Sequence, residues 1–345
     1  MSEAPRFPDV FAELLGGNLS PGTVRRVFDA ILAGEWTPVQ IAGFVSALRV
    51  RGETPEIVAA AAQAMRAAMV RVPHGLPRVL DTCGTGGDGL GTVNLSTGAA
   101  IVVASLGVPV AKHGNRAASS RAGSADVLEA LGIPIDLPPA AAGPLLEKVG
   151  ITFLMAQVHH PAMRHAAPAR RELGIRTIFN CLGPLSNPAG ATHQLVGAAE
   201  EPLRRLLAET LRSLGSVRGW VVRGVDGMDE VSPTGPSRVA AFTQAGVTEL
   251  EIAPEDFGLA PIPFEALRGG DARENAAILE KVLAGEPHPS LSGFVINAAA
   301  ALVVADDLPP RAAAARVQEA LASGAAGRLL VRWRDAAREL SATAR

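Results

Sequence analysis

The residues whose types and spacing suit chemistry stand between positions 80 and 131. A short apolar run leads into a glycine loop, Gly84-Thr85-Gly86-Gly87-Asp88-Gly89, and a second run ends in Lys112-His113-Gly114-Asn115-Arg116. Glycines let main-chain N–H groups approach an anion, and lysine, arginine and hydroxyl side chains supply further donors. We therefore predict a site for a phosphorylated small molecule where two neighbouring strands end.

Two further segments extend this set of donors. Asn94-Leu95-Ser96-Thr97 precedes a helix predicted at about 98–106, whose N-terminus would add its dipole to an anion site. Ser119, Ser120, Arg121 and Ser124 complete the set, and we expect Ser124 to cap the helix that follows it.

Lysine is rare in this chain, which makes Lys112 informative. Lysine and arginine together number 32, yet lysine occurs only at positions 112, 148 and 281. In a chain that uses arginine by default, a lysine beside a glycine loop indicates a compact point charge for a phosphate.

An acidic pair, Asp229-Glu230, follows a strand predicted at 218–223. Mg²⁺ commonly binds through one or two carboxylates together with substrate phosphates. In isolation such a pair is a solvated surface feature, but a phosphate site elsewhere in the chain favours a metal site.

Several common kinds of active site are disfavoured. The glycines at 84, 86 and 89 match the dinucleotide fingerprint, yet the next strand ends in Lys112-His113 and not in the acidic residue that would hold a ribose. The sequence has no P-loop signature, no Ser-His-Asp signature and no evident general base. His159, His160 and His165 lack metal-ligand spacing, so we interpret them as packing at a helix start.

The elements around these motifs predict two unlike domains. Residues 1–72 read as helices only, with helix starts at Thr37-Pro38 and Thr54-Pro55. From residue 73 to 345, apolar runs alternate with helical stretches, which predicts an α/β domain with a central, mostly parallel sheet flanked by helices. Helices from about 161–185 are expected to join the small helical domain.

The expected elements place the glycine loop and the 112–116 segment at the carboxyl ends of their strands. Strands are predicted at 78–82, 108–112, 151–155, 218–223 and 246–252. Helices are predicted at about 22–33, 98–106, 125–131, 139–149, 161–172, 201–214, 272–284, 292–305 and 309–322, and 180–188 reads as a stiff connection. In such sheets ligands bind beyond the carboxyl ends of the strands.

Composition excludes other classes of function. The net charge of −2 and the pI of about 6.4 give no basic field for nucleic acid. The sequence shows no signal peptide at its start and no apolar run long enough, about 18 residues, for a membrane span. Its two cysteines, Cys83 and Cys181, form no disulfide framework, so we expect a reducing cytosol.

Taken together, the motifs resemble those of the anthranilate phosphoribosyltransferase family. The matching segments run in order over nearly the whole chain: Gly84-Thr85-Gly86-Gly87-Asp88, Asn94-Leu95-Ser96-Thr97, Lys112-His113-Gly114-Asn115-Arg116, Gly123-Ser124-Ala125-Asp126, His160-Pro161-Ala162-Met163, Arg170-Arg171-Glu172-Leu173-Gly174, Gly183-Pro184-Leu185-Ser186-Asn187-Pro188 and Asp229-Glu230. Gln157 and His159 depart from the pattern, because the family often has proline and tyrosine there.

The resemblance implies a cytoplasmic homodimeric enzyme of tryptophan biosynthesis. It would join anthranilate to phosphoribosyl pyrophosphate and release pyrophosphate with Mg²⁺, two ions per subunit, in a site at the hinge between the domains. Residues implied for phosphoribosyl pyrophosphate are Gly84, Gly87, Asp88, Thr92, Asn94, Leu95, Ser96, Thr97, Lys112, His113, Gly114, Asn115, Arg116, Ala117, Ala118, Ser119, Ser120 and Ser124. Residues implied for anthranilate are Gly84, Asn115 and Arg170, with His113 and Pro184 nearby, and those for Mg²⁺ are Ser96, Asp229 and Glu230.

Two alternatives belong to other classes. A pyrimidine nucleoside phosphorylase shares the architecture and a glycine loop, but would not hold two metal ions on Asp229-Glu230. A non-enzymatic relative that binds nucleic acid would need a basic groove, which the net charge does not favour.

Overall fold

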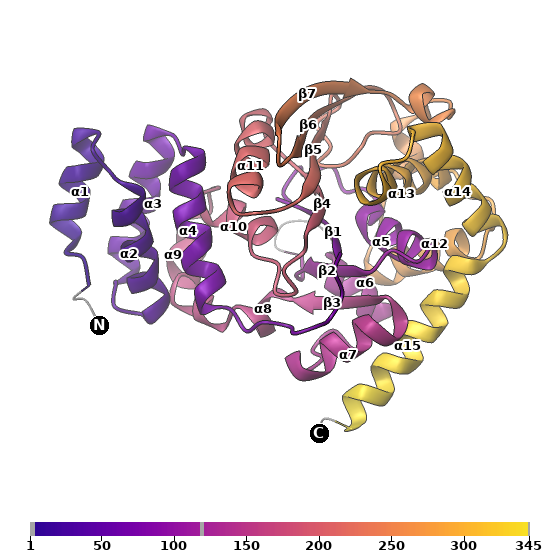
Figure 1. Ribbon diagram of the computed structural model, residues 1–345, viewed down its shortest axis with the longest axis horizontal. Helices are drawn as coiled ribbons and strands as arrows, with labels where there is room; N and C mark the ends of the chain where they lie inside the picture. The colour runs from indigo at the N-terminus through magenta and orange to yellow at the C-terminus, as the bar shows by residue number, and fades with distance from the viewer. Residues whose placement is uncertain (1–3, 118–120, 344–345) are drawn as a thin grey trace.

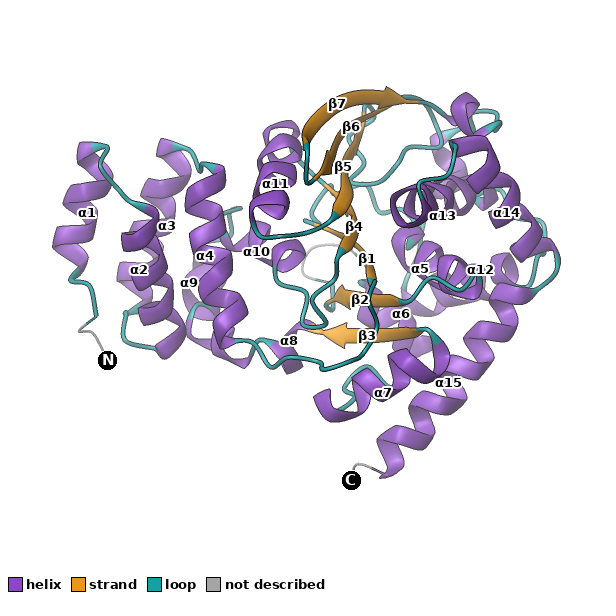
Figure 2. Ribbon diagram, viewed as in Figure 1, coloured by secondary structure: helices purple, strands orange, loops and turns teal. Residues whose placement is uncertain are grey.

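The computed structural model describes residues 4–117 and 121–343, and a seven-stranded sheet forms its centre. The strands are β1 (Leu80–Gly84), β2 (Val110–Gly114), β3 (Ile151–Met155), β4 (His193–Gly197), β5 (Arg218–Gly224), β6 (Ser237–Thr243) and β7 (Gly246–Ile252). Their order is β3-β2-β1-β4-β5-β6-β7. The first five in this order are parallel, and β6 and β7 are antiparallel additions at one edge (Figure 2). The mostly parallel sheet is thus confirmed.

The sequence predicts five of the seven strands. It places β3 and β7 correctly, and it starts β1 and β2 two residues too early. It misses β6 and β4. Strand β4 starts with two polar residues, and the second, Gln194, is buried because its amide donates to the carbonyl oxygen of Pro184 at 2.7 Å. A satisfied buried amide of this kind interrupts the apolar run from which a strand is predicted.

The N-terminal helices form a separate stack beside the sheet (Figure 1). They are α1 (Phe7–Gly16), α2 (Pro21–Ala33), α3 (Pro38–Arg51) and α4 (Pro55–Ala68). Thr37 and Gln40 form a capping box at the start of α3, and the Thr54 hydroxyl accepts from the N–H of Ile57 at the start of α4. Both predicted helix starts, and the all-helical domain, are therefore confirmed.

A second group of short helices packs on this stack: α8 (Ala156–His159), the 3₁₀ turn η1 (Pro161–His165), α9 (Ala167–Leu173) and α10 (Phe179–Leu185). Turn η1 lies against α2, α9 against α3 and α10 against α4. These contacts support our grouping of 161–185 with the helical domain. Hereafter "the helical unit" means α1–α4 with 161–185.

Two predictions in this region are wrong. The single helix expected at 161–172 is broken into η1 and α9, because Pro168 cannot donate to the preceding turn and restarts the helix. The stiff connection or hinge expected at 180–188 contains helix α10, which ends at Leu185, one residue after Pro184, whose missing N–H cannot continue the helical ladder.

Helices cover both faces of the sheet and build two cores. They are α5 (Leu95–Ser105), α6 (Ser124–Ala130), α7 (Pro139–Val149), α11 (Glu201–Ser213), α12 (Ala272–Leu283), α13 (Leu291–Asp306), α14 (Pro310–Ala322) and α15 (Ala325–Thr343), with the 3₁₀ turns η2 (Pro254–Phe257) and η3 (Phe264–Leu267). Successive residues of a strand face opposite ways. Leu195 and Val222 therefore join the core of α5 and α13, whereas Val196 and Val221 join a core shared by α11 and the helical unit.

Helix α13 is almost wholly buried in the first of these cores. By length and hydropathy, no single helix among the described residues could cross a bilayer. The pair α13 and α14 meets that criterion only jointly, with a bend of 119° between them.

Candidate active site

Three of the predicted motifs lie where β1, β2 and β5 end. The glycine loop follows β1, Lys112 and His113 lie in β2 beside it, and the acidic pair follows β5. The chain adds β2 and β3 on one side of β1 and then returns to add β4 on the other side. Such a reversal leaves a crevice at the carboxyl ends of the central strands, where α/β sheets bind ligands.

The glycine loop is held against the acidic pair. Gly86 and Gly87 have φ angles of 64° and 83°, in the left-handed region that glycine adopts without strain. The N–H of Gly86 donates to Asp229 Oδ2 at 2.9 Å, and a side chain on Gly84 would meet the same oxygen. Asp88 accepts from the N–H of Leu90 at 3.2 Å within the loop.

The start of α5 supplies further polar groups to the same cluster. Asn94 is held by both ends of its amide, which donates to Ala122 O and accepts from Asn275 Nδ2. The N–H of Ser96 donates to Glu230 Oε1 at 3.3 Å. Leu95 and Thr97 are buried, so the side chain of Leu95 belongs to the core, while Thr92 forms a bridge with Arg268.

Lys112 is buried inside this cluster. Its ammonium donates to the carbonyl oxygen of Thr82 and, at 3.2 Å, to Ser96 Oγ. Burial lowers the pKa of Lys112, while the negative charges of Asp81 and Glu230 act in the opposite direction. Lys112 therefore joins the end of β1, Ser96 and the acidic pair as a cationic centre.

The two carboxylates of the acidic pair are desolvated and repel each other. Burial, followed by repulsion from Asp88, raises the pKa of Asp229 to about 7. Burial and repulsion from Asp229 raise the pKa of Glu230 to about 8. Hard carboxylate oxygens held together against their own repulsion fit a divalent cation, which would stabilise their charged forms.

The described residues include few groups of metal-ligating side chains. Across 4–117 and 121–343, no group of three or more His, Cys, Asp and Glu side chains is arranged to hold a metal ion. The metal assignment therefore rests on Asp229, Glu230 and Ser96, with substrate oxygens as the remaining ligands.

The loop after β2 is tied to the start of α6. Asp126 accepts from the N–H groups of Ala117 and Gly123, both at 2.9 Å. Arg116 donates to Asp126 and bidentately to Glu129. Exposed Asn115 accepts from the N–H of Arg116 through its side chain.

Ser124 does not cap α6, contrary to our prediction. Gly123 occupies the N-cap position, Asp126 satisfies its N–H, and the Ser124 hydroxyl donates to Asn115 O at 3.3 Å. A Cβ on Gly114 would overlap that hydroxyl, which is why β2 ends in glycine. Ala118, Ser119 and Ser120 lie outside the described residues.

Two neutral histidines lie side by side near the end of β2. The rings of His113 and His160 are 5.0 Å apart, and His113 Nδ1 lies 3.1 Å from Gly183 O. Burial is the main cause that lowers the pKa of His113 to about 3 and that of His160 to about 4. His113 Nε2 is buried and has no partner within the residues that the structure describes.

His159, one of the two departures from the family pattern, contributes to the domain linker. Its Nδ1 lies 2.9 Å from Val70 O, and the N–H of Val70 donates to its main-chain oxygen. The other departure, Gln157, lies in α8.

Arg170 lies on α9, with its guanidinium carbon 5.6 Å from the centre of the Phe179 ring. Phe179 packs in turn edge-on against Phe28 of α2. The side chain of Arg170 is thus oriented by an aromatic pair in the helical unit, and the residue remains exposed. No described contact joins it to the glycine loop.

Sequence reasoning missed three residues that organise the site. Buried Asp81 accepts from the N–H of His113 at 3.1 Å and from Asn187 Nδ2 at 2.8 Å, which joins β1, β2 and the segment after α10. Arg176 donates to Gly86 O at 2.6 Å. The apolar run around Asp81 and the position of Asn187 after Leu185-Ser186 were the only signals in the sequence.

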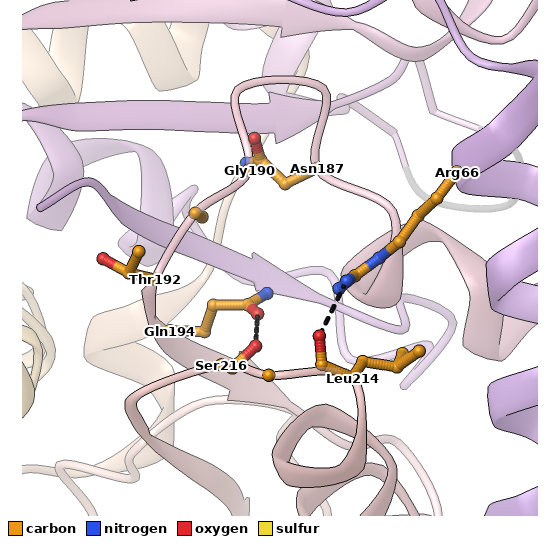
Figure 3. A pocket seen from close by; sticks show the side chains of 9 residues that line it. Arg66, Asn187, Gly190, Thr192, Gln194, Leu214 and Ser216 are labelled. Carbon is orange, nitrogen blue, oxygen red and sulfur yellow. Dashed lines mark hydrogen bonds between the residues drawn. The ribbon is translucent and has the colours of Figure 1, made fainter. Parts of the chain in front are cut away.

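A separate small cavity lies at the amino ends of β4 and β5, away from the carboxyl ends described above (Figure 3). Its volume is about 120 Å³, and its lining includes Gln194 and residues just before β4 and β5, such as Thr192 and Ser216. Arg66 of α4 reaches across it to donate to Leu214 O, and also donates to Leu185 O. Arg66 thereby caps two helix C-termini, a structural role for a cation.

Comparison with known proteins agrees with this architecture. The sequence profile described as "Glycosyl transferase family, a/b domain" matches residues 76–327, and the one described as "Glycosyl transferase family, helical bundle domain" matches 14–69. A protein named anthranilate phosphoribosyltransferase from Methylobacterium radiotolerans is 52% identical, over 93% of this chain and 93% of that protein.

Two solved structures show the same fold. Anthranilate phosphoribosyltransferase from Thermus thermophilus superimposes with a TM-score of 0.90 at 46% identity, over 95% of this chain and 99% of that one. The Saccharomyces cerevisiae protein, solved in complex with PRPP and Mg, has a TM-score of 0.90 at 28% identity, over 96% and 98% of the two chains.

Proposed function

Because the chain belongs to the anthranilate phosphoribosyltransferase family, we propose that the crevice at the ends of β1, β2 and β5 is its active site. The reaction transfers the phosphoribosyl group of phosphoribosyl pyrophosphate to the amine of anthranilate and releases pyrophosphate, a step of tryptophan biosynthesis. The observation that carries the assignment is the cluster in which Lys112 contacts Ser96 and Ser96 contacts Glu230.

The phosphoribosyl pyrophosphate half uses the donors of the glycine loop, α5 and the loop after β2. Gly84, Gly87 and Asp88 belong to the glycine loop. Asn94 to Thr97 start helix α5, whose dipole favours an anion at its N-terminus. Lys112 adds its charge from beneath, through Ser96. The bonds of Arg116 to Asp126 and Glu129 would have to open before it could bind a phosphate.

The metal part uses Asp229 and Glu230, with Ser96 between Glu230 and Lys112. When bound, Mg²⁺ supplies positive charge to the oxygens of the departing pyrophosphate. The two carboxylates hold the cation, and the N–H of Gly86 fixes the orientation of Asp229. Two ions per subunit is our proposal, supported by two adjacent carboxylates and several phosphate oxygens.

The acceptor half uses the helical unit. Arg170 presents a planar fork that matches a carboxylate such as that of anthranilate. His113 and His160 are uncharged at neutral pH, so they leave the lone pair of the aromatic amine free of a competing cation. Positioning of the amine against the anomeric carbon and electrostatic stabilisation of the leaving group would supply most of the rate.

Two properties of the whole protein belong to the same proposal. We propose a homodimer that pairs through the helical domain, where Leu15, Val39 and Val50 are exposed apolar residues. We also propose a cytoplasmic location, in keeping with the two free cysteines, Cys83 and Cys181.

The decisive experiment mixes the protein with Mg²⁺, phosphoribosyl pyrophosphate and anthranilate and follows the loss of anthranilate fluorescence. We expect consumption of anthranilate that stops when a chelator removes Mg²⁺. Phosphorolysis of thymidine or uridine in its place would support a nucleoside phosphorylase, and inactivity in both assays would contradict the proposal.

A further inference from the structure

Arg176, which lies between α9 and α10, contacts the glycine loop from the helical unit. Its Nη1 donates to Gly86 O at 2.6 Å, and its Nε lies 3.2 Å from Glu200 Oε1. Gly87 permits this approach, because a Cβ there would lie 2.8 Å from Arg176 Nη1. The guanidinium therefore lies directly against the loop.

Gly86 is thus held from two sides. Its carbonyl oxygen accepts from Arg176, and its N–H donates to Asp229 Oδ2 at 2.9 Å. Any shift of the loop away from Arg176 would move the donor that orients Asp229. The positive charge of Arg176 also acts on Asp229 by lowering its pKa.

The same arginine is connected to the N-terminal helices. Glu200, just before α11, accepts from Arg49 Nη2 at 2.6 Å, and Arg49 lies 3.7 Å from Glu53. Arg49 stands in the last turn of α3. Glu53 is 6% exposed and Arg176 is 23% exposed, so this chain of charges is less screened than an ordinary surface ion pair.

We propose that Arg176 is a positioning residue that makes the geometry of the glycine loop, and hence of Asp229, depend on contact between the helical unit and the sheet. The proposal rests on the assignment of Asp229 to Mg²⁺ under the proposed function. Arg176 acts through Gly86 and Asp229, and Glu200 transmits the position of α3 to it. A lysine cannot replace its fork, since one ammonium cannot reproduce the bidentate geometry toward Gly86 and Glu200.

The test compares Arg176→Gln with Arg205→Gln, a control on α11 whose exposed side chain pairs with Glu209. We expect Arg176→Gln to raise the KM for phosphoribosyl pyrophosphate and the Kd for Mg²⁺, measured by calorimetry without anthranilate, by roughly tenfold or more, the effect of one lost charged hydrogen bond. The KM for anthranilate should change less than about threefold. Arg205→Gln should change none of these quantities.

Glu200→Gln separates the two parts of the proposal. It keeps the bond from Arg176 to Gly86 but weakens the link to Arg49, so we expect a smaller change in the same direction. Arg176→Lys serves if the glutamine variant does not fold, and it should also raise the Mg²⁺ requirement. Parallel changes in both KM values, or unchanged Mg²⁺ dependence, would overturn the proposal.

Different results would contradict the proposed function. Wild-type protein that consumes no anthranilate contradicts the function, and Asp229→Asn with normal Mg²⁺ dependence contradicts the metal assignment. An active wild type with a Mg²⁺-sensitive Asp229→Asn, alongside an Arg176→Gln that matches wild type, contradicts the role of Arg176 alone.

Discussion

Gly197, the last residue of β4, lies against the main chain of Asp229 so closely that a Cβ at position 197 would overlap the carbonyl oxygen of Asp229. We expect Gly197→Ala to displace the acidic pair, with a loss of roughly 1–3 kcal/mol of stability from overpacking and a higher Mg²⁺ requirement. Thermal melts and Mg²⁺ titrations measure both effects. Gly235→Ala is the control, because a Cβ there meets open space. A Gly197→Ala variant that behaves like the control would contradict this reading of the contact.

Lys112→Ala is expected to weaken phosphoribosyl pyrophosphate binding and to leave anthranilate binding intact. The ammonium holds Ser96 Oγ and the Thr82 carbonyl, so its loss removes the charge under the anion site at a cost of roughly 1.5–3 kcal/mol. Calorimetric titration of each substrate measures the difference. Lys148→Ala removes an exposed lysine paired with Glu339 and should have no effect. An unchanged affinity of Lys112→Ala for phosphoribosyl pyrophosphate would contradict the assignment of Lys112 to that substrate.

Asp229→Asn combined with Glu230→Gln keeps the side-chain volume and removes both carboxylates. We expect a large loss of activity that high Mg²⁺ partly restores, with folding intact. The matched control is Asp306→Asn with Asp307→Asn, an adjacent acidic pair that binds Arg78 and Arg218. Normal rates at low Mg²⁺ in the first double variant would show that its acidic pair is only a surface feature.

The pH dependence of Mg²⁺ binding follows from the raised pKa values of Asp229, about 7, and Glu230, about 8. Protons compete with the cation, so Mg²⁺ affinity should rise between about pH 6 and pH 8.5, and binding should release protons. Calorimetry in buffers of different ionisation enthalpy detects that release. A flat affinity across this range would refute the prediction.

The metal-free protein should show the opposite trend in stability. The folded pair holds protons that the unfolded chain has already lost above about pH 4. These two groups therefore lower the free energy of unfolding as pH rises from about 4 to about 8. Melting curves of the metal-free protein, compared with the Asp229→Asn, Glu230→Gln variant, isolate this contribution, which the variant should lack.

Arg170→Lys is expected to raise the KM for anthranilate far more than the KM for phosphoribosyl pyrophosphate. A lysine loses the planar fork and its stacking on Phe179. Arg171 is the matched control, because successive helix residues point about 100° apart. Arg171→Lys should change neither KM in steady-state kinetics. A loss confined to Arg171→Lys would show that the other arginine binds the acceptor.

The sequence was sufficient for the parts of this protein that depend on local chemistry. Glycines, a helix start and a lysine at a strand end mark the site that we propose for the anion, and proline with threonine marks the starts of α3 and α4. These signals lie within a few residues of one another. The same reasoning predicted α11 and α13 to within a residue or two, because α11 has a continuous apolar face and α13 is apolar along most of its length.

Features that depend on distant partners escaped prediction. Gln194 is tolerated in β4 because its amide donates to the carbonyl oxygen of Pro184, and Lys112 is tolerated in the interior because Thr82 O and Ser96 Oγ accept hydrogen bonds from its ammonium. Arg176 has no local motif, and its partners, Gly86 and Glu200, are distant in the sequence. Helix α15, by contrast, was missed despite an amphipathic pattern with Leu329, Leu330 and Trp333 buried.

The two borders of the sheet differ in how they resist self-association. All five residues of β3, at one border, are buried, and α5, α7 and α8 contact that strand. β7, at the other border (Figure 1), carries Glu249 and Glu251 as exposed residues, of which Glu249 pairs with Arg204 of α11. Repeated negative charge on an edge strand disfavours edge-to-edge pairing between copies. The burial of β3 and the acidic residues on β7 therefore both disfavour the edge-to-edge strand pairing from which fibrils grow.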